Sequence, residues 1–260
     1  MEKFKYEYSF LPSKLDKISF RIISNDVRTQ IPMEKISSFP YSAIGLLKEV
    51  FPHETVSYRT GVLIGENIVL TAGHNLYDSR NNPNAPSEIL GSPVSIEFYP
   101  GLTNNKSNFG KCTSKKFYFS KNFPNSDRED YGIIILNENI GKETGFFNLK
   151  IFNVDEDLSN EFYNNGYPLN KTTDGNRVFY QYENKGNIIK ADEKKGIIVS
   201  GIQSSYGQSG AGLFYIKDNK YYIIGVHVAS SFDNTLFYAT MITKKRYEQI
   251  ISWIKDAENK

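Results

Sequence analysis

The stretch Ser205–Phe214, S-Y-G-Q-S-G-A-G-L-F, is a glycine-rich turn that runs into an apolar strand. Gly207 and Gly210 permit a bent backbone in which the amides of Gly207 and Ser209 point toward one place, because no Cβ is in the way. A serine hydroxyl is a weak nucleophile unless a base and such amide donors surround it. The pattern fits either a nucleophile loop or a plain Ser/Gly hairpin loop. The G-x-S-x-G elbow is disfavoured, because Ala211 stands where that motif needs its second glycine.

The composition is that of an ordinary globular protein. The chain has 260 residues, of which 39% are hydrophobic and 14% aromatic, which is enough to bury a large core. Its formal charge of +2 is spread along the sequence, so we expect neither a nucleic-acid partner nor a membrane surface. Cys112 is the only cysteine, which excludes an internal disulfide. We expect a monomer that uses no cofactor and no metal.

Residues 1–21 are interpreted as a leader or an N-terminal arm. Met1–Phe20 carries charges throughout and lacks the apolar segment of a signal peptide. We also find no run of residues that is long and apolar enough to span a membrane. The sequence as given leaves the compartment open, between the cytoplasm and secretion by a route that it does not reveal.

Short apolar or alternating runs between turn residues predict an all-β fold with antiparallel strands. The strands are expected within 41–50, 58–70 as a hairpin, 94–99, 133–136, 162–168, 178–182, 196–200, 221–228 and 236–242. Glycines within 137–149 mark a link between two halves. From Thr243 the apolar residues follow a helical period, which predicts a terminal helix. We therefore assign 22–140 to a first half, 141–242 to a second half and 243–260 to the helix.

Two polar residues lie at the ends of apolar strands in the first half. His74 follows Ile68–Thr71 on a small-residue turn, where a ring is held by the scaffold yet remains free to reach a cleft. By itself it fits equally well a histidine satisfied within the core. Asp130 precedes Ile133–Leu136, and a carboxylate at such a strand is costly to bury unpaired. We expect it either to face water or to pair with a histidine.

His74, Asp130 and Ser209 occur in the chain order of the chymotrypsin arrangement, which differs from the subtilisin and hydrolase orders. At these positions the sequence resembles the chymotrypsin-like serine proteases, and among them the glutamyl endopeptidase branch. The matching motifs are T-A-G-H at 71–74, D-Y-G at 130–132 and G-Q-S-G at 207–210. Further similarity lies in Ser24–Thr29, Phe39–Ile44, Gly166–Pro168, the strand that ends in His227, and Ile242–Thr243. The resemblance covers about residues 22–255.

The resemblance implies two six-stranded antiparallel β-barrels with an active site between them. It implies that Ser209 attacks the scissile carbonyl, that His74 acts as general base and then general acid, and that Asp130 orients the imidazole. The amides of Gly207 and Ser209 would form the oxyanion hole. The expected reaction is hydrolysis of peptide bonds in protein or peptide substrates.

The resemblance also implies a preference for glutamate, or aspartate, before the cleaved bond. In the glutamyl endopeptidases a histidine on the strand after the nucleophile receives the substrate carboxylate together with small hydroxyl residues. His227 matches that histidine, and Ser204 and Ser230 match the hydroxyl positions. A buried carboxylate would draw such an imidazole toward its charged form. The alternative is that His227 is a packed strand histidine without this role.

Three positions depart from the family pattern. Ala211 replaces a proline, and Tyr206 replaces a glycine, which would narrow the entrance of the specificity pocket. Gln208 stands where pancreatic-type enzymes have an aspartate, so an ion pair with a new N-terminus is not the activation switch here. The resemblance suggests instead that the leader is removed near Arg21–Ile22. Two alternatives to a glutamyl endopeptidase stay open, namely the same triad with another specificity and a protease-like binding module without turnover.

Overall fold

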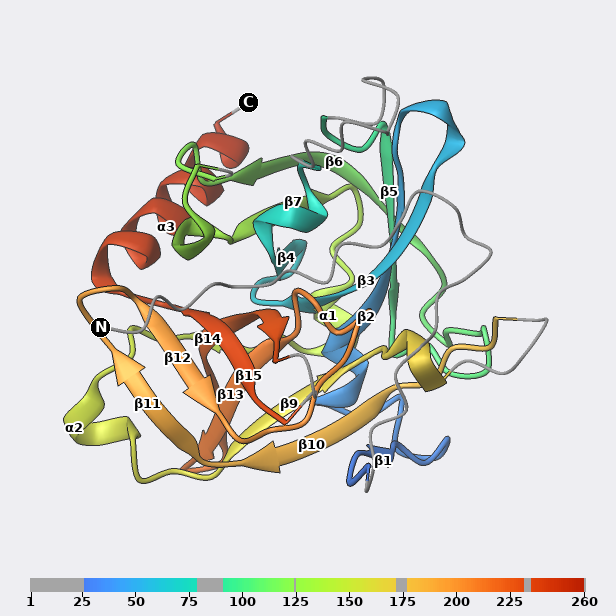
Figure 1. The fold of residues 1–260 in the computed structure, drawn as a ribbon. Coiled ribbons are helices and arrows are strands. Elements are labelled where there is room, and N and C mark those ends of the chain that lie inside the picture. Colours follow the sequence, from blue (N-terminus) through green and yellow to red (C-terminus); the bar gives the residue numbers. More distant parts are fainter. Residues whose placement is uncertain (1–25, 79–90, 124, 172–176, 232–234, 260) are drawn as a thin grey trace.

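The computed structural model describes residues 26–78, 91–123, 125–171, 177–231 and 235–259. The proposed leader, residues 1–21, and its cleavage site lie outside the described residues. Most of the regular structure is β-strand, in two units that lie side by side, with one long helix at the C-terminal end (Figure 1). The all-β expectation is therefore confirmed.

The first unit is a closed barrel of six antiparallel strands in the order β2-β3-β4-β7-β6-β5. Its strands are β2 (Ile44–Val50), β3 (Val56–Leu63), β4 (Ile68–Thr71), β5 (Ser95–Pro100), β6 (Cys112–Phe119) and β7 (Gly132–Leu136). β4 and β7 are buried along their whole length, because their apolar side chains fill both sides of the barrel wall. In β5 buried and more exposed residues alternate, as the sequence predicts.

The second unit is a sheet in the order β1-β10-β9-β13-β14-β15-β12-β11, with β8 pairing β14. Its strands are β1 (Thr29–Gln30), β8 (Asn148–Leu149), β9 (Phe162–Gly166), β10 (Tyr182–Gly186), β11 (Ile188–Asp192), β12 (Ile197–Ser200), β13 (Gly212–Lys217), β14 (Lys220–Ser230) and β15 (Phe237–Met241). The β13–β14 hairpin turns at Asp218 and Asn219, which both have positive φ angles, as the turn of such a hairpin requires.

The second unit differs from a fully hydrogen-bonded barrel in how its edges meet. β10 and β11 lie toward opposite ends of the strand order and do not pair with each other. They are nevertheless consecutive in the chain, and only Asn187 separates them. The continuous chain therefore joins the two sides of this half-barrel sheet, which takes the place of the second six-stranded barrel that the resemblance implies.

Two strands depart from their predicted positions. The strand expected at 178–182 begins at Tyr182 and continues to Gly186, because its register with β9 is carried by backbone pairing and not by an apolar run. β1 falls within the range that we assigned to the first half, yet it pairs with β10 of the second sheet.

The terminal helix α3 spans Lys244–Glu258, and the Thr243 side chain caps it by accepting a hydrogen bond from the Arg246 amide. α3 follows the second sheet in the chain but packs against the first barrel, beside β6 and β7 (Figure 1). Trp253 stacks on Tyr118 and packs on Tyr131, and the Tyr131 hydroxyl donates to Gln249 at 2.7 Å. The helix therefore ties the end of the chain back onto the first unit.

The remaining helices are short. They are α1 (Gly141–Thr144) and α2 (Val154–Asp157), with 3-10 turns at Tyr41–Ala43, Pro52–Glu54, Gly73–Asn75, Asp127–Glu129 and Leu169–Lys171. One apolar cluster fills the first barrel and continues into Phe214, Ile223 and Val226 of the second sheet, and a second cluster lies within that sheet. No helix in the described part of the chain is long and apolar enough to cross a membrane.

Candidate active site

The register of β4 and β7 brings His74 and Asp130 together. Thr71 at the end of β4 pairs with Gly132 at the start of β7, so the residues just beyond these ends are neighbours. The Asp130 carboxylate is fully buried and accepts two hydrogen bonds from His74, at 2.7 Å from ring Nδ1 and 2.8 Å from the backbone amide. The expected histidine partner of Asp130 is confirmed. Because both carboxylate oxygens are engaged, the ring orientation of His74 is fixed.

The loop that carries Ser209, residues 204–210 between β12 and β13, is hereafter called the Ser209 loop. It lies against the first barrel beside His74. The Ser209 carbonyl accepts hydrogen bonds from the Thr60 amide at 3.0 Å and from the Asn75 side chain at 3.1 Å. Asn75 directly follows His74 in the chain. The neighbour of His74 therefore binds the backbone of Ser209. Between the described side chains of His74 and Ser209 there is no direct hydrogen bond, and their contact stays a prediction.

Two glycines give the Ser209 loop its bent shape. Gly207 and Gly210 have φ angles of 96° and 90°, a region that disfavours residues with a Cβ. Gly210 also packs directly against Thr60 and Thr71 of the barrel, where a Cβ would meet their oxygen atoms. The amides of Gly207 and Ser209 have no hydrogen-bond acceptor among the described residues.

His227, Ser204 and Ser230 lie together beside this loop. The Ser204 and Ser230 hydroxyls are 2.7 Å apart, and the Ser230 hydroxyl lies 3.4 Å from His227 Nε2. The His227 ring is almost completely buried and stacks on Phe237 with ring centres 4.6 Å apart. Its backbone also binds the loop, since the Gly210 amide donates to the His227 carbonyl at 2.8 Å. The three residues that the sequence grouped are thus brought into one cluster.

Both ring nitrogens of His227 face backbone carbonyls. Nδ1 lies 2.8 Å from the Gln208 oxygen, and Nε2 lies 3.1 Å from the Ala229 oxygen. A neutral imidazole has a single N–H and can donate to only one of them. Burial nevertheless lowers the pKa of His227 to about 4, with the carbonyl hydrogen bonds acting in the opposite direction. The ring is therefore neutral at pH 7 in the free protein, although its surroundings suit a second proton.

Tyr206, one of the departures from the family pattern, packs on the first barrel. Its ring lies under the Arg59 guanidinium, 4.2 Å from the charge to the ring centre, which is a cation–π contact. Whether this ring narrows the specificity pocket stays a prediction. Ala211 is fully buried and directly precedes β13.

Sequence reasoning gave no role to three residues that hold the Ser209 loop. Thr60 and Asn75 bind its backbone, and Arg28 donates to the side chains of Ser205 and Gln208. Arg28 lies in the Ser24–Thr29 stretch that carried part of the resemblance, and this was the available signal for it. Thr60 and Asn75 carried no signal, because their contacts join residues that are far apart in the sequence.

No metal centre is found among the described residues, in which no group of three or more His, Cys, Asp or Glu is arranged to hold an ion. Cys112 is buried in the first barrel, and burial raises the pKa of its thiol to about 12.

A closed barrel beside a half-barrel sheet is the fold of the chymotrypsin-like serine proteases. In sequence the chain is similar to a glutamyl endopeptidase. It is 24% identical over 258 residues to the glutamyl endopeptidase of Bacillus licheniformis, which covers 95% of this chain and 73% of the relative. It is also 30% identical over 154 residues to a protein of Bacillus subtilis named extracellular metalloprotease, of which the match spans only 46%. No family model matches the chain.

Solved structures agree on the fold. A Glu endopeptidase in complex with MPD superposes with a TM-score of 0.71 and 23% identity, over 90% of this chain and all of that one. The thermostable serine protease AL20 from an extremophilic microorganism gives 0.66 with 13% identity, over 84% of this chain and 97% of that one. Protease Anisep from Arthrobacter nicotinovorans gives a TM-score of 0.64 with 15% identity, over 82% of this chain and 95% of that one. Together the relatives support a serine endopeptidase that acts on proteins or peptides.

Proposed function

We propose that the protein is a serine endopeptidase that cleaves after glutamate or aspartate by means of Ser209, His74 and Asp130. The observation that carries the proposal is the doubly hydrogen-bonded His74–Asp130 pair, joined through Asn75 to the backbone of Ser209. Such an arrangement matters because a serine hydroxyl needs a positioned base to become a nucleophile.

Proton transfer follows from the hydrogen bonds of His74. The Asp130 carboxylate accepts a hydrogen bond from Nδ1–H, which leaves Nε2 of the neutral ring as the free base. Nε2 takes the Ser209 proton while the Ser209 oxygen bonds to the scissile carbonyl carbon. It then gives that proton to the departing amine as the peptide bond breaks, and the acyl-enzyme forms. A water molecule then attacks the carbonyl carbon of the acyl-enzyme while His74 Nε2 takes its proton. Nε2 gives that proton to the Ser209 oxygen as the ester bond breaks, which releases the acid and restores Ser209.

The oxyanion of each tetrahedral intermediate would accept hydrogen bonds from the amides of Gly207 and Ser209. The positive φ angles of Gly207 and Gly210 and the lack of other acceptors among the described residues support this role. Losing one such donor typically lowers the rate by about 10²–10³-fold. The glycines are therefore expected to matter nearly as much as the triad.

Acid specificity is assigned to His227, Ser204 and Ser230. The hydroxyls of Ser204 and Ser230 offer donors to a carboxylate, and His227 Nε2 lies within reach of Ser230. A bound carboxylate would raise the pKa of His227 from its lowered value and so would draw a proton onto the ring. An uncharged side chain in the same place would leave the ring neutral and gain none of this attraction.

The test uses a peptide library and a fluorophosphonate, with wild type, Ser209→Ala and His227→Ala. We expect wild type to be labelled and to cleave after acidic residues, Ser209→Ala to do neither, and His227→Ala to cleave with the acid preference lost. Unchanged acid preference in His227→Ala would favour the same triad with a specificity set elsewhere. A wild type that binds peptides but is neither labelled nor active would favour a binding module.

A further inference from the structure

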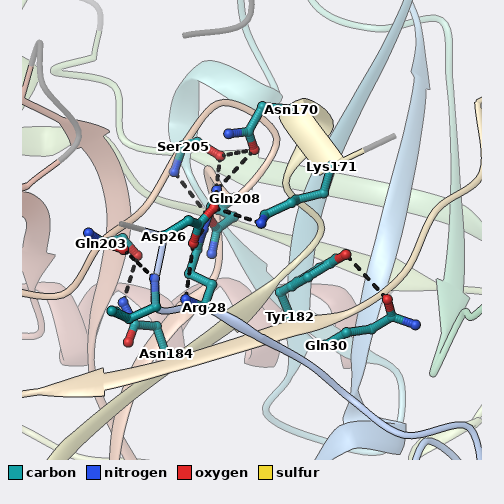
Figure 2. Close-up of polar contacts among 11 residues, drawn as sticks. Asp26, Arg28, Gln30, Asn170, Lys171, Tyr182, Asn184, Gln203, Ser205 and Gln208 are labelled. Carbon is teal, nitrogen blue, oxygen red and sulfur yellow. Dashed lines mark hydrogen bonds and ion pairs between the residues drawn. The ribbon is translucent and has the colours of Figure 1, made fainter. Parts of the chain in front are cut away.

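Gln208, the residue directly before Ser209, is held by a buried arginine from the N-terminal part of the described chain. Arg28 Nη1 donates to Gln208 Oε1 at 2.9 Å and to the Ser205 hydroxyl at 2.6 Å, and the Ser205 amide donates to the same Gln208 oxygen (Figure 2). The Arg28 side chain has no exposed surface, and Gln208 is fully buried. A buried cation thus contacts the residue directly before the candidate nucleophile.

Every N–H of the Arg28 guanidinium has an acceptor. Besides the two bonds from Nη1, Nε donates to Asp26 at 3.0 Å, and Nη2 donates to Asp26 at 2.7 Å and to Asn170 at 3.2 Å. Arginine has five such donors in a rigid fork, so all five are satisfied. A buried arginine is stable only when its charge is paired and its donors are engaged. The Asp26 carboxylate supplies the opposite charge, and Lys171 also binds it at 2.8 Å.

The segment that carries Arg28 is attached along its length to the second sheet. The Val27 amide donates to the Gln203 side chain at 2.9 Å, just before the Ser209 loop. Thr29 and Gln30 pair with Glu183 and Tyr182 as strand β1. The Tyr182 hydroxyl also donates to the Gln30 side chain at 3.3 Å (Figure 2). Arg28 is therefore presented to the loop by a docked strand.

The Gln208 side chain connects Arg28 to the two parts of the candidate site. Its backbone flanks the Ser209 amide, which is one of the two oxyanion donors, and its carbonyl lies 2.8 Å from His227 Nδ1. The side-chain nitrogen Nε2 of Gln208 donates a hydrogen bond to the Asn164 side chain at 3.4 Å. Fixing this one side chain therefore limits the orientation of the peptides on both sides of residue 208.

We infer that Arg28 is a positioning residue that holds the Ser209 loop in its reactive conformation when the 26–30 segment is docked. The inference rests on the proposed function. Gln208 cannot form an ion pair with a freed N-terminal amine, and the Arg28 guanidinium supplies an internal cation at the same residue instead. Docking of the segment, and not the charge of a new N-terminus, then orders the loop.

The test compares Arg28→Met with the control variant Lys150→Met. Lys150 also pairs with a buried carboxylate, Asp157, but its partners Asp157, Glu156 and Tyr215 do not belong to the Ser209 loop. We measure kcat and KM on a peptide with an acidic residue before the cleaved bond, and hydrogen exchange of the loop amides. The amides of Gln208, Gly210 and Ala211 report on the loop, because all three are hydrogen-bonded in the structure.

We expect Arg28→Met to lower kcat by about 10²-fold or more, with KM changed by less than about threefold, because an oxyanion donor is misplaced. Exchange of the three reporting amides should accelerate in the same variant. Lys150→Met should lose thermal stability and keep both the kcat and the slow exchange. A merely structural role of Arg28 would make the two variants alike.

A folded Arg28→Met variant with wild-type kcat and wild-type exchange would overturn the inference and leave the proposed function intact. A wild type that neither cleaves nor reacts with a fluorophosphonate would contradict the proposed function, while the exchange data would still decide whether Arg28 orders the loop. If Arg28→Met does not fold, Arg28→Lys gives the same two readings, because lysine keeps the charge but cannot reproduce the fork.

Discussion

His74 and His227 are the same residue type in opposite environments, and their difference defines their proposed roles. His74 is partly exposed and hydrogen-bonds a buried carboxylate. His227 is buried among backbone carbonyls and an aromatic ring, and burial lowers its pKa to about 4. The hydrogen bond to Asp130 thus supports His74 as the proposed base. Burial keeps the His227 ring neutral until a substrate carboxylate binds beside it.

At the residue scale this predicts a pH dependence for the binding of peptides that end in glutamate. The pKa of His227 rises when a carboxylate binds, so binding takes up a proton between about pH 4 and the raised pKa. Affinity is therefore highest at the low end of this range and falls as the pH rises through it. Calorimetry in buffers of different ionisation enthalpy measures the proton uptake.

His227→Gln and a peptide that ends in glutamine are the two controls for this prediction. Neither should show proton uptake above pH 5, where the peptide carboxylates are already ionised. Equal proton uptake by wild type and His227→Gln would show that another group accepts the proton.

At the element scale, β2 carries a buried carboxyl side chain. Glu49 is fully buried, and its carboxylate oxygens have no hydrogen-bond partner among the described residues. Burial raises the pKa of Glu49 to about 8, and the Arg59 charge and the nearby Ser57 hydroxyl only partly oppose this. The folded protein therefore holds a proton on Glu49 over a range in which the unfolded chain has lost it.

This difference predicts that the free energy of unfolding falls between about pH 4.5 and pH 8, by roughly 4 kcal/mol from this group. Glu49→Gln should remove that slope and be more stable than wild type at pH 8. Urea unfolding of both proteins at several pH values measures the effect. Parallel pH profiles of the two proteins would show that Glu49 is not the group responsible.

Strands with runs of apolar residues could be predicted from the sequence, and strands recognisable only by their backbone pairing could not. The sequence predicts β7 and β14 from the apolar runs Ile133–Leu136 and Tyr221–Val228, whose side chains are mostly buried. β10 reads Y-E-N-K-G and was expected four residues too early, since its only strong signal is its register with β9. β1 has only two residues and both are exposed, so no pattern distinguishes it.

At the scale of the whole molecule, the two units are joined by contacts between residues that are distant in the chain. α3 returns from the second unit to the first, and β1 precedes the first barrel yet pairs with the second sheet. The Ser209 loop receives hydrogen bonds from Thr60 and Asn75 on one side and Arg28 on the other. The candidate site therefore depends on the assembly of both units.

Contacts between residues that are distant in the chain also explain why only part of the candidate site could be predicted from the sequence. Motifs at His74, Asp130 and Ser209 are local patterns that a single sequence displays. The contact of Arg28 with Gln208 joins residues 180 positions apart, and the resemblance of the stretch around Arg28 does not reveal which residue it contacts. Supporting residues of this kind become visible only when the fold is known.

The central claim is that both units place one imidazole, one carboxylate and one hydroxyl where they react together. A crystal structure of the protein after reaction with a fluorophosphonate tests it directly. We predict phosphorus bonded to the Ser209 oxygen, its phosphoryl oxygen about 2.7–3.1 Å from the amides of Gly207 and Ser209, and the His74 ring within hydrogen-bonding reach. An adduct on another residue, or a His74 ring turned away from a modified Ser209, would contradict the account.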